Sequence, residues 1–314
     1  MKQEKMKVTK TEQSTGITCF QYKLGDEQGW VYMCFPFPNC YLWANDIHMN
    51  HIPSINTEPE DLIKINICLS GHCETLLEDG RYVYMEPGMI SIDSNAANAA
   101  FQYQTSLYQG IEIAVERQKW EESPNLLLEE LGLNIADLEQ LLQKRKGSYL
   151  GRYGISLQAI SEKIYAYLTG GEGDIYDYRF LLLQLIYELK HKGITAVERD
   201  IFLTRGQREI AQESEKIMTE DLRERHSIEE LANRFKVSPS SLKKYFELRF
   251  GQPVSVYMRE RRMDFAKRQL TQTNRNIIEI AEMVGYSNQG KFCGVFKKQV
   301  GVTPLEYRRQ NVVV

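Results

Sequence analysis

Two segments in the last third of the chain repeat one pattern of apolar and polar positions. The first runs from Ser227 to Arg262, and the second runs from Asn276 to Arg309, about fifty residues later. A long internal repeat of this kind indicates a duplicated structural unit. With one residue inserted in the second copy after its serine, the superposed pairs are Ile228 with Ile277, Leu231 with Ile280, Ala232 with Ala281, Phe235 with Val284, Ser238 with Ser287, Leu242 with Phe292, Phe246 with Phe296, Gly251 with Gly301 and Tyr257 with Tyr307.

The first copy predicts two short helices joined by a tight turn. Ser227 with Glu230 three positions later is a capping box, in which each side chain bonds the other residue's free amide. Ser238 can cap the second helix, and Gly251 would end it. The apolar residues between them recur at helical spacing. A short helix, a tight turn and a second amphipathic helix form the unit whose second helix enters a major groove of DNA.

The second copy follows the same plan with different side chains. Asn276 and Glu279 form the equivalent cap pair, and Gly285 supplies the positive φ that the turn favours. Pro304 stands at the tolerated first position of a last helix. Between the copies, Val254 to Leu270 is expected to form one continuous helix of about 25 Å at 1.5 Å per residue.

The segment from about Gln207 to Arg309 resembles the AraC/XylS family of transcription regulators. The residues that carry the resemblance are Tyr257, Arg262, Ala266 and Leu270 in the inter-repeat helix, and the run IIEIAEMVGYSN of the second copy with the Phe292, VFKK, Gly301, Pro304 and Tyr307 that follow it. The resemblance implies a sequence-specific regulator whose partners are double-stranded DNA and, for an activator, RNA polymerase. The alternative is an all-helical interaction module without a DNA role.

The family reaches base edges from the outward face of each second, or recognition, helix. In the first copy the matching positions hold Ser240, Lys243 and Lys244, and in the second they hold Gln289, Gly290, Lys291 and Gly294. Glutamine can read adenine and lysine can read guanine, whereas the glycines offer only close approach of the backbone. Where the family usually has a polar residue and then an arginine, this chain has Cys293 and Gly294. We therefore expect the second copy to bind DNA less strongly than the first.

The N-terminal part is patterned as strands up to about Val115. Ile65, Ile67 and Leu69 alternate with polar neighbours, and turns are predicted at residues 78–81 and 86–88. Short strands with such turns favour a β-sandwich or small barrel.

The run LSGHCETLLEDGRYVYMEPGMISI resembles the cupin-type sensor barrel found ahead of the DNA-binding domain in this family. The fold class expected is α+β, with a cupin-like domain at 1–120, a helical association region at 121–194, a linker at 195–206 and an AraC-type DNA-binding domain at 207–314.

The helical region should contain helices at Leu126–Gln143, Ile155–Leu168 and Ile175–Leu189. The last of these is apolar over more than one packing face. It is either wedged between the barrel and the other helices or used for self-association, as the family often uses helices that follow its barrel. In the second case the expected contacts of a homodimer are Leu182, Leu185 and Leu189.

An aromatic stretch in the first strands is the candidate site for a small-molecule effector. Trp30, Tyr32, Phe35 and Trp43 either line a cavity in the barrel, since such cavities are mostly apolar and aromatic, or belong to its core. A sensor that responds to a protein or peptide partner is the rival mechanism. The cupin pattern HxH with a later Glu and His is absent around His48, His51 and His72, so we expect no metal, no cofactor and no enzyme activity; a cupin enzyme fused to a DNA-binding tail is the rival class.

Charge and composition agree with a two-part regulator. From Gln207 onward there are 20 Lys and Arg against 14 Asp and Glu, whereas Met1 to Gly206 has 19 against 28, so a basic C-terminal part follows an acidic remainder. The polar start, MKQEKMKVTKTEQ, lacks the apolar centre of a signal peptide, and no apolar run is long enough to cross a membrane. We expect a cytoplasmic protein with reduced cysteines, with a redox pair of Cys68 and Cys73 as the alternative.

Overall fold

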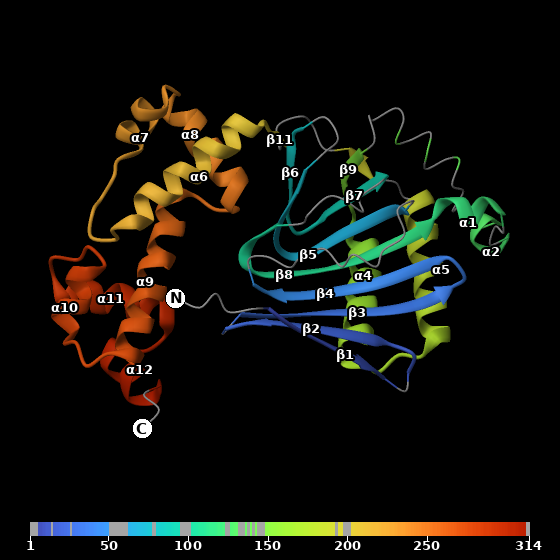
Figure 1. The fold of residues 1–314 in the computed structure, drawn as a ribbon, viewed down its shortest axis with the longest axis horizontal. Coiled ribbons are helices and arrows are strands. Elements are labelled where there is room, and N and C mark those ends of the chain that lie inside the picture. The colour runs from blue at the N-terminus through green and yellow to red at the C-terminus, as the bar shows by residue number, and fades with distance from the viewer. Residues whose placement is uncertain are drawn as a thin grey trace. The chain divides into compact units, whose positions relative to one another are not determined.

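The chain folds into two compact units, Met1–Thr204 and Arg205–Val314 (Figure 1). The computed structural model describes residues 6–13, 15–25, 27–49, 62–76, 80–94, 102–122, 126–130, 136, 139, 142, 148–191, 194–196 and 202–311. Most of the predicted helix 126–143, the predicted turn residues 78 and 79, and His51 lie outside these residues.

The N-terminal unit is built on an antiparallel sheet in which the described residues form eleven strands. The strands are β1 (Lys7–Glu12), β2 (Thr18–Leu24), β3 (Glu27–Phe37), β4 (Cys40–His48), β5 (Leu62–Leu76), β6 (Tyr82–Met85), β7 (Met89–Ser94), β8 (Gln102–Glu116), β9 (Ser148–Arg152), β10 (Thr195–Ala196) and β11 (Phe202–Leu203). The strand order is β1-β2-β3-β4-β8-β5-β7-β9-β10, with β6 beside β5 and β11 beside β6. No pairing among the described residues joins β1 to β10, so the sheet is not closed. The cupin-like barrel is therefore not confirmed.

Local chemistry explains the shape of the longest strands. Pro38 and Asn39 make the turn between β3 and β4, with Asn39 in the left-handed region at φ 57°. The pairing of β5 with β8 slips after Cys68 and again after Gly71. Gly71 has φ +77°, and a Cβ there would collide with the carbonyl group of Leu107. Only glycine lets the two backbones approach so closely at this irregularity.

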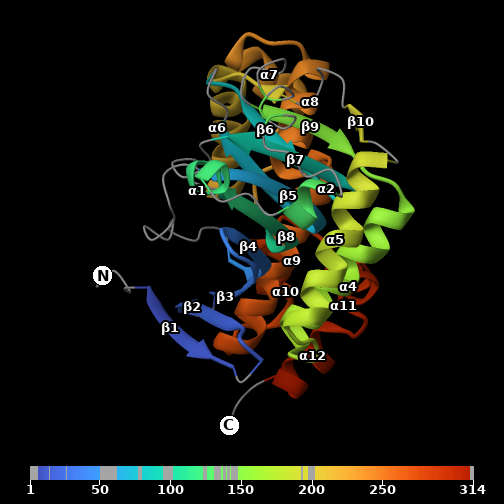
Figure 2. The same ribbon diagram turned by 90° about the vertical axis from the view of Figure 1, so that its right-hand side faces the viewer.

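Two helices cover one face of this sheet (Figure 2). They are α4 (Ile155–Gly170) and α5 (Ile175–His191), and they pack on β3, β4, β5 and β8. Leu182 and Leu185 of α5 are fully buried in this core, and Leu189 is partly buried against it. The expectation that Leu182 and Leu185 form an association surface is thus corrected, because the sheet covers them within one chain.

The segment expected to be a linker is partly paired with the sheet. Thr195 and Ala196 pair with β9, and Phe202 and Leu203 pair with β6. Arg205 already begins the first helix of the next unit. Two further short helices, α1 (Arg117–Glu122) and α2 (Leu126–Glu130), follow β8.

All secondary-structure elements among the described residues of the C-terminal unit are helices. They are α6 (Arg205–Glu220), α7 (Ile228–Phe235), α8 (Pro239–Phe250), α9 (Val254–Gln272), α10 (Ile277–Met283), α11 (Gln289–Val300) and α12 (Pro304–Asn311). Each repeat has an aromatic core of its own, around Phe246 in the first and around Phe292 and Phe296 in the second. Helix α9 belongs to both, since Tyr257 packs in the first core and Leu270 in the second. The predicted helix 254–270 is confirmed and extends by two residues.

Candidate nucleic-acid interface

The first repeat begins with the predicted capping box. The amide of Glu230 donates to Ser227 Oγ at 3.1 Å, and the amide of Ser227 donates to Glu230 Oε2 at 2.8 Å. Ser238 caps α8 by accepting from the amide of Ser241 at 3.0 Å. Gly251 ends α8 in the left-handed conformation. All four predicted end signals are confirmed: Ser227 and Glu230 fix the start of α7, and Ser238 and Gly251 fix where the recognition helix α8 begins and stops.

The second repeat is capped in the same way, with one difference. Asn276 and Glu279 form the reciprocal pair at 2.8 and 3.0 Å. Gly285 makes the turn with φ +76°, as predicted. The N-cap of α11, however, is Asn288, which accepts from the amide of Lys291 at 2.9 Å. The inserted residue of this copy thus moves the cap one position beyond the serine that matches Ser238.

The structure places the predicted DNA contacts on the outward faces of the two recognition helices. On α8, Leu242 and Phe246 are buried in the core. On α11 the buried anchors are Phe292 and Phe296. The predicted contact residues of both helices are all exposed: Ser240, Lys243, Lys244, Gln289, Gly290, Lys291 and Gly294. They remain predicted contacts, now grouped as one polar face on each helix.

Helix α6 is a part of this unit that the pattern of the two repeats did not predict. It contacts α8 and α9, and its buried residues are Ala211, Ser214 and Met218. Their spacing of three and four residues is the sequence signal that could have identified the helix. Tyr257 of α9 donates its hydroxyl to Glu215 Oε1 of α6 at 2.8 Å, so this helix also positions the linking helix.

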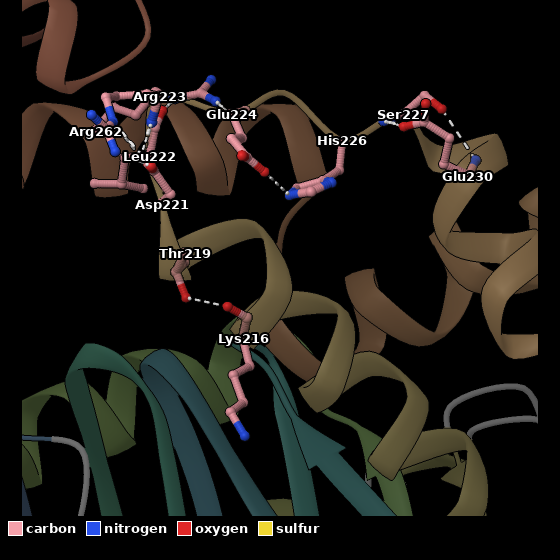
Figure 3. A network of polar contacts seen from close by, with 10 residues as sticks. All are labelled: Lys216, Thr219, Asp221, Leu222, Arg223, Glu224, His226, Ser227, Glu230 and Arg262. Carbon is pink, nitrogen blue, oxygen red and sulfur yellow. Dashed lines mark hydrogen bonds and ion pairs between the residues drawn. The ribbon is translucent and has the colours of Figure 1, made fainter.

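A loop between α6 and α7, residues 221–226, contacts both repeats. Figure 3 shows this loop with Arg262 of α9. Arg262 of α9 donates from Nε to the carbonyl oxygen of Leu222 and from Nη2 to that of Glu224, both at 3.1 Å. Arg225 donates from Nη2 to the carbonyl oxygen of Gly285 at 3.1 Å, in the turn of the second repeat. The relative positions of the two recognition helices therefore depend on the loop 221–226 as well as on α9.

The predicted effector residues fall into two groups in the N-terminal unit. Phe35 packs edgewise on Tyr41 with ring centres 5.1 Å apart, and Tyr41 stacks on Trp43 at 5.4 Å. Trp30 instead contacts His48, with ring centres at 6.1 Å. Tyr32 packs against the core under α4 and α5, whereas Trp43 belongs to the core of the opposite face. The four rings thus do not converge on one point.

The cysteines and histidines do not assemble into a reactive site in the described part of the chain. Burial raises the pKa of the Cys73 thiol to about 12 and raises that of Cys68 further, and both are free thiols. Thiols with raised pKa values are poor nucleophiles at neutral pH. His48 lies 3.2 Å from Asp46, and no group of three metal-binding side chains occurs among the described residues.

Comparison with known proteins places the similarity in the C-terminal unit. A helix-turn-helix domain family matches residues 231–310. The probable transcription factor PqrA of Proteus vulgaris is 31% identical over 86 residues, which are 27% of this chain and 70% of that protein. The uncharacterized HTH-type transcriptional regulator YdiP of Escherichia coli is 34% identical over 93 residues, 30% of this chain and 31% of the relative. The chain spans 31% of the length of YdiP, 11% of that of the regulator YtdP of Bacillus subtilis and 40% of that of the porin thermoregulatory protein EnvY of Escherichia coli.

Two solved structures are among those that match the chain. The C-terminal domain of AraT, a response regulator from Geobacillus stearothermophilus, is 31% identical and covers 36% of this chain and 90% of its own, with a TM-score of 0.32. ToxT from Vibrio cholerae is 13% identical and covers 88% of this chain and 100% of its own, with a TM-score of 0.30. In the described part of this chain, no helix is long and apolar enough to span a membrane.

Proposed function

The chain belongs to the AraC/XylS family of transcription regulators, and from this premise we propose that it binds specific double-stranded DNA with both helix-turn-helix repeats in response to an effector bound by the N-terminal unit. One observation carries the DNA-binding part. Two capped recognition helices present polar faces outward while α9 packs in the cores of both repeats. A rigid pair of such helices suits two successive major grooves, about 34 Å apart.

The test is a footprint of the full chain on DNA sites selected from a random pool. Two engaged repeats should protect roughly two turns of DNA on one face, because each helix occupies one major groove. The site is expected to be bent, at a cost of a few kcal/mol. Protection limited to a single groove would show that the second repeat, with its Gly294, does not dock.

We propose that an exposed face of α5 joins two chains into a homodimer. Tyr176 and Phe180 are 70% and 62% exposed, and Tyr187 is 47% exposed on the same helix. Their spacing of four and seven residues puts them on one face. A dimer would raise operator affinity through effective concentration. Sedimentation of Phe180→Glu should show monomers, whereas the same state in wild type and variant would remove the proposal.

A cluster of buried polar side chains in the N-terminal unit supports the proposal that the effector is a polar small molecule. Asn45, Lys64, Asn66 and Ser91 lie on the sheet face of Trp43 and are nearly inaccessible to solvent. Asn45 donates to Glu112 Oε1 at 2.7 Å, the Lys64 ammonium lies 5.7 Å from the Trp43 ring centre, and Asn66 Oδ1 has no hydrogen-bond partner. An unsatisfied buried acceptor is costly unless a ligand or water fills its place.

Tryptophan fluorescence can test this proposal, because all three tryptophans precede residue 121. Fractions of small molecules from the host should change the emission, and Trp43→Phe should reduce the change more than Trp30→Phe. A change produced only by protein fractions would favour a protein or peptide partner instead.

A further inference from the structure

A cavity of about 710 Å³ lies within the C-terminal unit, where the two repeats meet. One wall is the recognition helix α8, with Lys243 and Glu247. Another is the start of α9, including Arg259 and Met258, and Tyr286 of the second repeat also lines the cavity. The loop 221–226 adds Glu224, Arg225 and His226. The cavity is therefore formed jointly by both repeats and the helix that connects them.

Positive charge dominates this cavity. Four lining residues carry a positive charge, and they are Arg225, Lys243, Arg259 and Arg262. The opposing carboxylates are Glu224 and Glu247, and Glu224 lies 3.6 Å from His226. The hydrogen bonds of Arg225 and Arg262 go to main-chain carbonyl oxygens, which carry no net charge. Burial and the nearby charge of Arg225 lower the pKa of Arg262 from its usual value, as expected where cations crowd together.

The cavity adjoins the face of α8 that is expected to meet DNA. Lys243 and Glu247 stand one helical turn apart on that helix, and Ser240 precedes Lys243 by three positions. Lys243, Arg225 and Arg259 are exposed, so a polymer lying against α8 can reach their charged groups. Of the predicted contact residues on this helix, Lys243 lines the cavity and Lys244 does not.

We infer that this cavity is a phosphate-binding site for the DNA backbone between the two major grooves. In this site Lys243 and Arg259 bind phosphate oxygens instead of base edges. The inference rests on the proposed DNA-binding function and assigns these residues a role in it. Phosphate contacts set the register of a protein on DNA without reading its sequence. Contacts shared by both repeats would hold the second recognition helix in its groove even though Gly290 and Gly294 provide few base contacts.

The test measures how salt affects the binding of the full chain to a fluorescent 24-base-pair duplex of arbitrary sequence. The variants are Arg259→Gln in the cavity, Glu247→Gln in the same cavity with the opposite charge, and Lys216→Gln as a control. Lys216 is exposed on α6, does not line the cavity and points away from the loop 221–226 (Figure 3). Far-UV circular dichroism confirms that each variant is folded.

Arg259→Gln should weaken duplex binding and reduce the slope of log Kobs against log salt by about 0.9, the value for one lost phosphate contact. Glu247→Gln should strengthen binding, and Lys216→Gln should leave affinity and slope at wild-type values. A slope for Arg259→Gln equal to that of wild type would overturn the assignment of a phosphate-binding site. Failure of the wild-type chain to bind any duplex would instead overturn the proposed function itself.

A second arm uses inorganic phosphate at constant ionic strength, because a free anion has the same chemistry. We expect millimolar phosphate to leave duplex binding unchanged. Displacement of the duplex by phosphate from wild type but not from Arg259→Gln would show a site for free anions and would overturn the assignment to the DNA backbone.

Discussion

The two repeats share one plan but satisfy it differently at the turn. In the first repeat the left-handed position is Lys236, with φ 55°, and in the second it is Gly285, with φ 76°. A Cβ on Gly285 would lie 2.9 Å from the carbonyl oxygen of Leu222 and 3.1 Å from that of Arg223. The turn itself therefore tolerates a side chain, as Lys236 shows. Glycine is required in the second repeat because the backbone of the loop 221–226 packs against it.

The recognition helices differ in where their charge lies. In α8 the adjacent cations Lys243 and Lys244 occupy the middle of the helix, whereas in α11 Lys297 and Lys298 occupy its last turn. Cations at a helix C-terminus interact favourably with the helix dipole. The second helix thus places two of its three lysines where they stabilise the helix, and only Lys291 among the predicted DNA contacts.

The largest effect should come from removing the aromatic anchor of each repeat. Phe246→Ala and Phe296→Ala should each destabilise the C-terminal unit by about 3–5 kcal/mol, because both rings are fully buried. Urea unfolding followed by circular dichroism measures the loss, with the exposed Leu305→Ala as the control. Equal loss of helix in both variants would show that the repeats unfold together, and a loss below 1 kcal/mol in either would contradict the burial.

The next largest effect should come from substitutions at the two turn residues, which should change the stability of the two repeats differently. Gly285→Ala should cost about 2–3 kcal/mol, since it adds left-handed strain and a close contact with backbone. Lys236→Gly removes the same kind of strain, so it should be neutral or stabilising by up to about 1 kcal/mol. The same urea experiment compares the two, and equal costs would refute a glycine requirement set by packing.

Base reading should be unequal between the two helices. Lys244→Ala should reduce specific binding by about 1–3 kcal/mol and relax the preference at one base position. Gln289→Ala should have the smaller effect of the two. Selection from random DNA followed by sequencing measures both preferences. If Lys244→Ala weakened binding to all sequences equally, Lys244 would be a phosphate contact.

The smallest effect should be a gain at Gly294. A Cβ there would meet no atom within 4 Å, so Gly294→Ala should stabilise α11 by about 1 kcal/mol. Gly290→Ala is the matched control, because its Cβ would lie 3.1 Å from Asn288 Oδ1, the atom that caps the helix. The midpoint temperature of thermal unfolding should rise for Gly294→Ala only. An equal rise for Gly290→Ala would contradict this explanation.

Interactions within a few residues were predictable from the sequence alone. Ser227 and Asn276 cap their helices as expected, and the helix that joins the repeats spans the expected residues. Capping and helical periodicity act between residues three or four positions apart, so the chain encodes them locally. The same local logic identified both recognition helices and the polar residues on their outward faces.

Only the tertiary structure decided which of several suitable faces is used. Helix α5 is apolar over more than one packing face, so its sequence did not distinguish the buried Leu182 from the exposed Phe180; the position of the sheet did. The aromatic residues of β3 and β4 were split between two cores by strand alternation and pairing. Lys243 became part of a cavity because the loop 221–226 and α9 pack beside it. These outcomes depend on elements far apart in the chain, and a local pattern carries no information about which partner will cover it.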